Sequence, residues 1–569
     1  MFYSPAVPGN GASEPTSPRA FNLADLFEIV VDTVPERTAL VCPARADGPD
    51  PGGPGVRWTY RQLDERANRL GHHLLDHGVK AGDHVAVLAW NRAEWIEVQL
   101  GIYKARASVI NVNFRYVADE LSYMLDNSDA VAVVFERSFA PMVAEVRADA
   151  PKLRHFVVID DGDDGEEAAK AIAELGAVDY EDALAAASPD RDFPPRSPDD
   201  LYILYTGGTT GMPKGVLWRS EDIFFAALGG GGFGQEPIMT PEELAGRVAT
   251  DDAVVVNVVN APVMHGGGQW ASFIGFFGGN TVVLNCDHHF DGQHVARMAA
   301  DEHATSIMVV GDAMARPLAD AIANPADDYD LSSVFIVGSG GAILSKAIRE
   351  ELQQLLPNAM VMDSFGASET GHAGTVMDLE RGGPRFTMNP TTNVLDDEGR
   401  PVQPGSGQVG KLARCGHIPL GYYKDEEKTA TTFLVDPGGR RWVIPGDSAT
   451  ISADGVLELL GRGSVCINTG GEKVYPEEVE AALKAHPDVF DAVVVGVPDE
   501  RFQERVAAIV TLRGDANIEL DDLQDFCHTK IARYKVPRQL HVTDEIPRTP
   551  VGKPDYRWAR RIAVNERSE

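Results

Sequence analysis

LYILYTGGTTGMPKG, residues 201–215, joins a short apolar run to a loop rich in glycine and threonine. From Tyr205 to Gly215 the loop has four glycines, three threonines and Lys214. Glycine lets backbone N–H groups approach anionic oxygens, threonine hydroxyls can donate to the same oxygens, and the lysine adds positive charge. The stretch therefore predicts a polyphosphate cradle behind a strand, with a nucleoside triphosphate as its ligand. A flexible surface turn of the same composition is an equal alternative while the loop is considered alone.

The spacing of this loop differs from that of the Walker P-loop. Lys214 is followed by Gly215, where that pattern requires serine or threonine, and it follows Pro213, where the pattern requires glycine. The sequence therefore disfavours a standard P-loop ATPase.

The composition is that of a large globular protein. The 569 residues are 44% hydrophobic and 24% charged, which suggests roughly three or four structural units. A formal net charge of -34 disfavours broad electrostatic binding to nucleic acid or anionic membranes. The only phosphate site that this charge allows is a local one.

Cysteine usage and the N-terminus bear on the compartment. The five cysteines are scattered without a CxxC pair, which argues against a disulfide framework or a structural zinc site and favours a reducing cytoplasm. Residues 1–20 are rich in proline, serine and glycine and lack an apolar core, so we interpret them as a disordered lead-in. No apolar run has the length of a membrane span.

The order of apolar patterns predicts an α/β fold. Short apolar runs typical of buried strands occupy residues 85–88, 131–135, 156–159 and 281–284. A helical pattern over 60–70 follows Thr59, a candidate N-cap. A proline- and charge-rich connector at 188–198 joins two lobes of one large domain, 21–463, and a compact strand–helix–strand pattern restarts after 461–464. The sequence therefore predicts a small C-terminal domain over 464–569.

Further loops carry groups that suit a nucleotide. DSFGASET, residues 363–370, places an aromatic ring, a hydroxyl and a carboxylate together; Phe365 can stack on a base and Glu369 can ligate Mg²⁺. GSGGA, residues 338–342, follows an apolar run, and small residues there let a flat ring or an acyl chain pass close to the backbone. Taken alone, a buried phenylalanine and a helix-capping Ser-x-x-Glu variant explain the first stretch at least as well, and a tight turn without a ligand is the alternative for the second.

Three charged residues extend the pattern. Asp447 follows the apolar run 442–444 and can accept from ribose hydroxyls, and Arg462 lies between two glycines. Lys553 lies in IPRTPVGKP, residues 546–554, where three prolines stiffen the loop. A turn aspartate and an exposed surface lysine are the more common identities of such residues when each stands alone.

Together, in this order and across almost the whole chain, these motifs resemble the adenylate-forming superfamily of acyl-CoA synthetases, peptide-synthetase adenylation domains and luciferases. GGEKVYPEEVE, residues 470–480, also falls in family order. The resemblance implies a large N-terminal domain of layered sheets and helices with a small, mobile α+β C-terminal domain. It also implies two half-reactions: a carboxylate attacks the α-phosphate of ATP and releases pyrophosphate, and a thiol then attacks the acyl-adenylate and releases AMP.

The resemblance also assigns site residues. Lys553, Glu369, Thr206 and His265 form the catalytic group, and Glu369 and Thr206 hold Mg²⁺. Nucleotide binding falls to Thr206, Gly207, Gly208, Thr209, Thr210, Lys214, Gly340, Gly341, Ala342, Asp363, Ser364, Phe365, Gly366, Ser368, Asp447, Arg462, Lys473 and Lys553. The acid and CoA fall to His265, Gly266, Gly338, Ser339, Gly340, Gly470 and Gly471.

Family members rotate the small domain, which withdraws the lysine and brings the Gly470-Gly471 loop to the active site. The hinge is Ser464 here, where aspartate is common, so a charge that can favour one state is absent. Phe365 replaces a frequent tyrosine and Ser368 a frequent threonine.

The acid is the least determined part of the reaction. His265 is either a group near the substrate carboxylate or a core histidine, and the glycines that follow it leave space for a bulky apolar acid. The chain most resembles actinobacterial ligases for fatty acids or steroid side-chain acids, and the sequence leaves these two open. Loading of a separate acyl carrier protein, a non-catalytic nucleotide-binding role and a luciferase-like activity are alternatives. The oligomeric state is open as well, with a homodimer as one option.

Overall fold

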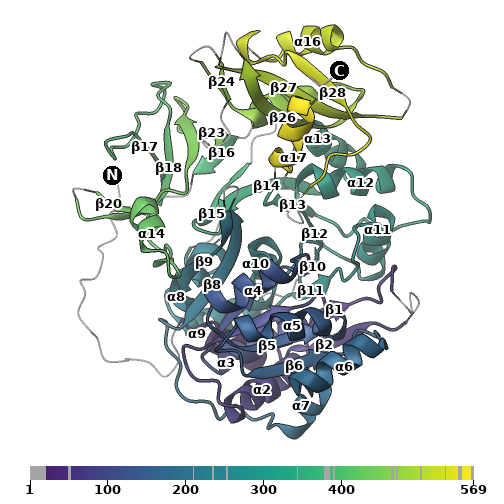
Figure 1. The fold of residues 1–569 in the computed structure, drawn as a ribbon, viewed down its shortest axis with the longest axis vertical. Helices are drawn as coiled ribbons and strands as arrows, with labels where there is room; N and C mark the ends of the chain where they lie inside the picture. The colour runs from purple at the N-terminus through teal and green to yellow at the C-terminus, as the bar shows by residue number, and fades with distance from the viewer. Residues whose placement is uncertain are drawn as a thin grey trace.

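The computed structural model describes residues 21–48, 53–208, 211–232, 236–250, 254–342, 344–376, 385–388, 391–436, 438–462, 467–469, 472–499, 503–514, 516–531, 533–548 and 554–565. The proposed lead-in, 1–20, lies outside them. Four sheets organise this part of the chain, and helices pack around them (Figure 1). No described helix is long and apolar enough to cross a membrane.

The first lobe is built on a parallel sheet of five strands in the order β4-β3-β5-β6-β7. Its strands are β3 (His84–Leu88), β4 (Ser108–Asn111), β5 (Ala130–Glu136), β6 (His155–Ile159) and β7 (Val178–Asp179). The predicted apolar runs at 85–88, 131–135 and 156–159 are therefore confirmed as buried strands. Buried on both faces, such strands are almost continuously apolar.

Helices cover this sheet and connect it to the second lobe. They are α1 (Leu23–Thr33), α2 (Tyr60–Asp76), α3 (Ala93–Lys104), α4 (Ala118–Asn127), α5 (Ala140–Val146), α6 (Glu166–Leu175) and α7 (Tyr180–Ala186). Thr59 caps α2 as predicted. Its side chain accepts from Gln62 N, and the Gln62 side chain accepts from Thr59 N. The connector 188–198 packs back on α1, where Arg196 pairs with Asp25 and Glu28 at 2.5 and 3.0 Å.

A second sheet of 15 strands changes from parallel to antiparallel pairing after β14 (Met360–Ala367). The parallel part contains β1 (Thr38–Cys42), β10 (Val256–Val259), β11 (Thr281–Leu284), β12 (Ser306–Val309) and β13 (Ile336–Gly340), with β2 (Val56–Thr59) antiparallel at its edge. The antiparallel part contains β15 (Gly371–Val376), β16 (Arg385–Met388), β17 (Thr392–Leu395), β18 (Gly410–Arg414), β20 (Phe433–Val435), β21 (Arg441–Val443), β22 (Asp447–Ile451) and β23 (Leu457–Arg462).

A three-stranded sheet lies in the order β19-β9-β8, from β8 (Leu201–Gly208), β9 (Gly211–Arg219) and β19 (Gly421–Tyr422). The remaining large-domain helices are α8 (Ser220–Ala227), α9 (Pro241–Thr250), α10 (Gly266–Phe277), α11 (Gly292–Asp301), α12 (Gly311–Ala323), α13 (Lys346–Leu355) and α14 (Glu426–Thr432). Figure 1 shows α10, α11, α12 and α13 between the first lobe and the C-terminal part of the chain, and α14 next to β20.

The C-terminal part forms its own sheet and core. The sheet contains β24 (Ile467–Thr469), β25 (Glu472–Val474), β26 (Val489–Asp499), β27 (Gln503–Leu512) and β28 (Gln539–Val542), and its helices are α15 (Pro476–Lys484), α16 (Leu520–His528) and α17 (Tyr556–Asn565). It lies at the end of the molecule next to α12 and α13 (Figure 1). Lys484 pairs with Asp312 of α12 at 3.1 Å, which ties the two parts together.

Candidate active site

The glycine- and threonine-rich stretch is a β-hairpin. β8 and β9 pair from Leu201 opposite Arg219 to Gly208 opposite Gly211, and Thr206 lies opposite Lys214. The predicted loop over 205–215 is therefore wrong in extent, because antiparallel pairing continues through most of it. Thr209 and Thr210 lie outside the described residues. Lys214 Nζ lies 2.5 Å from Asp425 Oδ2 and lowers the pKa of that carboxyl.

A second hairpin carries the Phe-Gly-x-Ser-Glu motif. Residues 363–367 belong to β14, 368–370 form the turn, and β15 starts at Gly371. The motif is thus strand and turn, where the sequence predicted one short loop. Phe365 packs on Phe386 with ring centroids 4.2 Å apart. Thr370 Oγ1 accepts from Ala367 N at 2.9 Å and so tightens the turn that presents Glu369.

Two hydrogen bonds join the two hairpins. Trp218 Nε1 in β9 donates to the carbonyl oxygen of Ser368 at 3.0 Å. Tyr422, which lies opposite Val216 in the β9–β19 ladder, donates from its hydroxyl to Glu369 Oε1 at 2.8 Å. The Glu369 turn is therefore fastened to the hairpin that contains Thr206 and Lys214.

A buried arginine supports the Glu369 turn from behind. Arg414 donates to the carbonyl oxygens of Thr370 and His372, and the residue is 6% exposed. Burial lowers the pKa of Arg414 to about 10, so it stays protonated at neutral pH. Burial, together with the charge of Arg414, lowers the pKa of His372 to about 4. Of these two residues behind the turn, Arg414 is therefore charged at neutral pH and His372 is neutral.

The strand ends beside this turn hold the predicted small residues. Ser339 and Gly340 in β13 lie opposite Asp363 and Ser364 in β14. Apart from Gly338 and its chain neighbours, no described residue has a heavy atom within 4 Å of a Cβ built on Gly338, so the space beside that residue is open in the described part of the chain. Gly341 has φ +86°, and Ala342 follows it in a bend.

Asp363 is buried at the same edge. Burial raises its pKa to about 7, against the opposing effect of Arg349, whose Nη2 lies 3.6 Å from the carboxylate. Ser339 contacts the start of α12, since its hydroxyl accepts from Gly311 N at 3.2 Å. The nucleotide-binding role expected of Asp363 stays a prediction.

The two residues predicted to hold ribose are neighbours across a ladder. Asp447 is the first residue of β22 and lies directly opposite Arg462, the last residue of β23. The sequence placed Asp447 at the end of the strand 442–444; in the structure that strand ends at Val443 and Asp447 begins the next one. In the small domain Lys473 lies opposite Asn468 in the β24–β25 ladder.

Asn111 ties the hairpin to the segment that carries His265. Its Nδ2 donates to the carbonyl oxygens of Tyr205 and Met264 at 2.9 and 2.7 Å, and its Oδ1 accepts from Tyr205 N at 2.8 Å. His265 precedes α10 as its N-cap residue, with Gly266 at the first position of the helix. The candidate acid-binding residues and the hairpin therefore share one anchor.

Several predicted residues lie outside the described residues: Lys553, Gly470, Gly471 and the hinge residue Ser464. The ends of the loop that contains Lys553 are described. Arg548 and Pro554 face each other in an antiparallel bridge, and Arg548 Nη2 pairs with Asp491 Oδ1 at 2.6 Å. The base of the lysine loop is therefore closed and fastened to β26.

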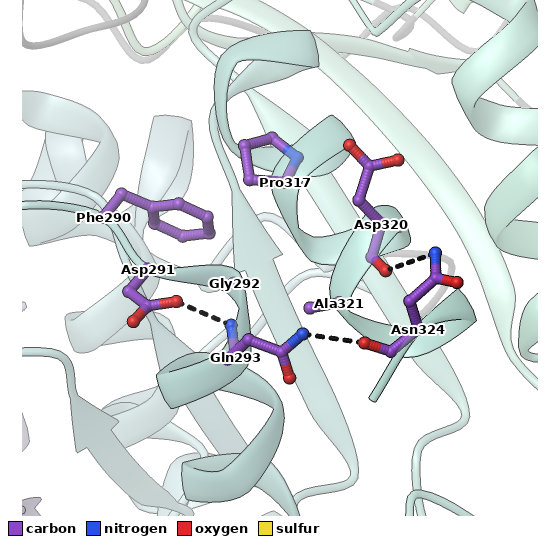
Figure 2. Close-up of a pocket in the computed structure, with 8 residues that line it drawn as sticks. All are labelled: Phe290, Asp291, Gly292, Gln293, Pro317, Asp320, Ala321 and Asn324. Carbon is purple, nitrogen blue, oxygen red and sulfur yellow. Dashed lines mark hydrogen bonds between the residues drawn. The ribbon is translucent and has the colours of Figure 1, made fainter. Parts of the chain in front are cut away.

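A surface hollow of about 470 Å³ lies away from these residues, between the start of α11 and α12 (Figure 2). Its polar groups already serve the fold, since Asp291 caps α11 and Gln293 Nε2 donates to the carbonyl oxygen of Asn324 at 3.0 Å. None of the residues that line it belongs to the predicted site, so we do not assign the hollow to catalysis.

Comparison with known families agrees with this arrangement. The AMP-binding enzyme model matches residues 27–423, and the AMP-binding enzyme C-terminal domain model matches residues 478–553. The chain belongs to the AMP-binding enzyme family. The predicted superfamily is thereby confirmed.

Relatives of this AMP-binding enzyme include curated CoA ligases. A Mycobacterium marinum protein named medium/long-chain-fatty-acid–CoA/3-oxocholest-4-en-26-oate–CoA ligase is 48% identical over 549 residues, 95% of this chain and 96% of its own length. A Rhodococcus rhodochrous 3-oxocholest-4-en-26-oate–CoA ligase is 48% identical over 550 residues, with the same coverage. The anthranilate CoA ligase AuaEII has a TM-score of 0.79 at 23% identity, covering 96% of this chain and 98% of its own, which shows the same fold.

Four positioning residues of this AMP-binding enzyme were not predicted from the sequence: Asn111, Trp218, Arg414 and Tyr422. Each acts through a neighbouring residue, and none was assigned a role in the site from the sequence. Asn111 gave the strongest signal, as a polar residue at the end of an apolar run, where parallel strands of an α/β sheet present ligand-binding groups.

Proposed function

We propose that this chain is an ATP-dependent, AMP-forming acyl-CoA ligase for a bulky hydrophobic acid. In the first half-reaction a carboxylate oxygen attacks the α-phosphorus of ATP, and the bond to pyrophosphate breaks. In the second, the CoA thiolate attacks the acyl carbon and AMP leaves. One observation carries the proposal: the Thr206–Lys214 hairpin and the Glu369 turn, far apart in sequence, are hydrogen-bonded to each other through Trp218 and Tyr422.

The joined hairpins suit the charges of the first half-reaction. Attack at phosphorus needs alignment and charge stabilisation more than covalent chemistry from the protein. Lys214, Thr206 and the hairpin tip would hold the pyrophosphate being displaced. Glu369 offers a carboxylate held by one neutral hydroxyl donor, which fits a hard cation, and with Thr206 it would hold Mg²⁺. When bound, Mg²⁺ supplies positive charge beside the phosphate oxygens.

The other site residues take roles that follow the same geometry. Phe365 would flank adenine and Ser368 would contact the α-phosphate. Asp447 and Arg462 would bind the two ribose hydroxyls, which is supported by their position directly opposite each other. Lys553 would lie between the carboxylate and the phosphate and offset their repulsion as they approach.

The acid would bind beside the small residues of β13 and α10. The space at Gly338 is open. Asn111 bonds both to Tyr205 in the β8–β9 hairpin, which we call the phosphate hairpin, and to Met264, the residue before His265 and Gly266. Relatives at 48% identity are named as ligases of medium- and long-chain fatty acids and of a steroid side-chain acid. We therefore propose these two acid classes as substrates.

We further propose two functional domains, 21–463 and 464–569, with the hinge at Ser464. Rotation of the small domain would withdraw Lys553 and bring Gly470, Gly471 and Lys473 to the acyl-adenylate. Such a rotation has to break the Asp312–Lys484 pair, which is buried between the two parts. We place the enzyme in the cytoplasm, in keeping with Cys42, Cys286, Cys415 and Cys527, which are free thiols.

The test is a product assay with the purified chain, ATP, Mg²⁺, CoA and a panel of medium-chain, long-chain, aryl and steroid side-chain acids. We expect acyl-CoA and AMP in equal amounts. Glu369→Gln should lose most activity, while Glu398→Gln, on an exposed turn, should retain it. Formation of ADP, or no thioester from any acid, would contradict the proposal. Transfer to a carrier protein without transfer to CoA would favour the carrier-loading alternative.

A further inference from the structure

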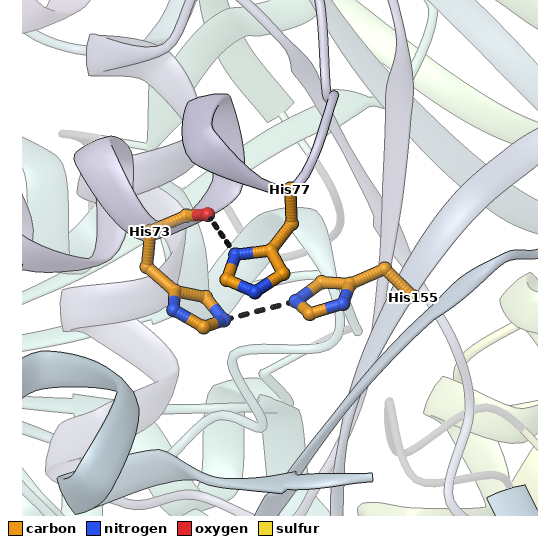
Figure 3. A group of neighbouring side chains, drawn as sticks. All are labelled: His73, His77 and His155. Carbon is orange, nitrogen blue, oxygen red and sulfur yellow. Dashed lines mark hydrogen bonds between the residues drawn. The ribbon is translucent and has the colours of Figure 1, made fainter. Parts of the chain in front are cut away.

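Three histidines meet at the side of the first lobe, away from the candidate active site. His73 and His77 lie near the C-terminal end of α2, and His155 is the first residue of β6. Figure 3 shows the three rings gathered side by side, although His155 lies 82 residues beyond His73 in sequence. Each ring offers one nitrogen to a group of atoms that all lie within 4.8 Å of one another.

The local geometry presents these nitrogens together. His73 and His77 are four residues apart, a spacing that places two side chains on the same face of a helix. His73 Nε2 lies 2.9 Å from His155 Nε2. His77 Nδ1 lies 2.7 Å from the carbonyl oxygen of His73. A backbone carbonyl only accepts, so Nδ1 of His77 carries a proton, and in the neutral ring Nε2 is the nitrogen with the lone pair.

The surroundings suit neutral ligands that an ion can reach. His73 and His155 are buried, and His77 is exposed. Burial lowers the pKa of His73 and His155 to about 4, with a further contribution from the neighbouring imidazoles. Asp76 and Arg154 are the charged groups that act on the cluster, with opposite signs. Solvent therefore reaches the site from the His77 side.

We propose that His73, His77 and His155 bind one divalent late-transition-metal ion of the Zn²⁺ class, with solvent at the fourth position. Imidazole nitrogen is a ligand of choice for Zn²⁺, Co²⁺, Ni²⁺ and Cu²⁺, whereas Mg²⁺ prefers oxygen. The ion joins the end of α2 to the start of β6. It acts as a clamp on the first lobe, and this role is independent of the function proposed for the nucleotide site.

Two movements accompany binding. Two nitrogens on one tetrahedral Zn²⁺ are about 3.3 Å apart, so the His73–His155 pair has to open by a few tenths of an ångström. The proton between them moves to a Nδ1 atom. His77 is stacked on His155, with ring centroids 4.4 Å apart and an interplanar angle of 18°, so its ring has to turn for its lone pair to face the ion. His77 is exposed, so in that turn its Nδ1 exchanges the hydrogen bond with the His73 carbonyl for one with solvent, and the core is not disturbed.

The experiment uses the full chain without an affinity tag, stripped with a chelator and titrated with ZnCl₂ by calorimetry and with CoCl₂ by visible absorption. We expect one ion per chain, the visible bands of four-coordinate Co²⁺, and a rise in Tm with Zn²⁺ that the chelator reverses. MgCl₂ should give none of these signals.

His77→Ala tests the site without touching the core, because this side chain is exposed. It should weaken binding of Zn²⁺ at least about 100-fold, since a direct ligand matters more than the second-shell partners whose loss costs 10–100-fold. His72→Ala is the matched control. His72 lies on the same helix but pairs with Asp192 outside the cluster, so binding should be unchanged.

A second variant guards against loss of folding. His155→Asn keeps a polar side chain at this buried position, and its circular dichroism and Tm without metal are compared with those of the wild type. Wild-type protein that binds no Zn²⁺, or Zn²⁺ binding that is equally strong in folded His77→Ala and His155→Asn, would overturn the proposal. Binding of more than one ion with no change of Tm would do so as well.

Discussion

The two halves of the candidate active site are held in different ways. In the large domain, the Glu369 turn is fastened to the phosphate hairpin by Trp218 and Tyr422 and supported from behind by the buried Arg414. In the small domain, the described base of the lysine loop is closed by one backbone bridge and by the Arg548–Asp491 pair. The first half is built into the sheets, and the second is carried on a separate sheet.

This difference corresponds to two tasks. Groups that hold the leaving pyrophosphate have to be in place before reaction, because preorganised charges stabilise a transition state without further rearrangement. Lys553, which we propose to act in one half-reaction only, would have to be movable, and rotation of the small domain would move it. The described contacts between the two parts include one buried ion pair, Asp312–Lys484, and the stacking of Arg316 on Phe490.

The largest effect should come from Lys553→Ala. Removing the charge that bridges the two anions should slow acyl-adenylate formation by about 10²–10³-fold, the range seen for single groups that stabilise transition-state charge. Conversion of supplied acyl-adenylate to thioester should change by less than about twofold. The measurement is pyrophosphate release against thioester formation, with Lys530→Ala as a surface control. If both steps fail together in folded protein, the division between the two halves is wrong.

Arg414→Met should disrupt the half of the candidate active site that lies in the large domain. It leaves the carbonyl oxygens of Thr370 and His372 without a buried donor, at a cost of about 2–4 kcal/mol in unfolding free energy. Both half-reactions should slow, because the Glu369 turn loses its support. The control is Arg400→Met, whose side chain is 69% exposed and which should leave the free energy of unfolding nearly unchanged. Urea unfolding followed by tryptophan fluorescence measures both, and equal effects would contradict the role of Arg414.

Arg548→Met should affect only the half of the candidate active site that lies on the small domain. Losing the pair with Asp491 loosens the base of the lysine loop, so adenylation should fall about tenfold, equivalent to about 1.4 kcal/mol. Thioester formation from supplied acyl-adenylate should hold, and Tm should stay within a few degrees. Arg560→Met removes an exposed pair with Glu504 on the same domain and serves as the control. Equal loss in both half-reactions would assign Arg548 to general stability.

The smallest effect should come from the contact between the halves. Lys484→Met leaves the buried Asp312 carboxylate unpaired and weakens the docking seen here. Limited proteolysis at 463–466, where the two parts join, should accelerate about three- to tenfold. In a double-mutant cycle with Asp312→Asn, the coupling energy should be about 1–2 kcal/mol. No change in the cleavage rate and no coupling would show that this pair does not hold the small domain.

Local signals carried much of the fold. The helix from Tyr60 was predicted by its N-cap Thr59 and its apolar spacing, and the structure confirms both. The strands at 85–88, 131–135 and 281–284 were predicted by short apolar runs. The extent of the two hairpins was not predicted, because a glycine-rich segment has the composition of a loop and its partner strand cannot be identified from the sequence.

The sequence by itself determined the family, the chemistry and the order of the motifs, since each is written in a short stretch of neighbouring residues. Only the tertiary structure decided which groups support them. The Tyr422–Glu369 and Trp218–Ser368 bonds span 53 and 150 residues, and the three histidines come from two elements of the first lobe. Such contacts depend on strand register and on the packing of helices against sheets, which no local pattern of residues specifies.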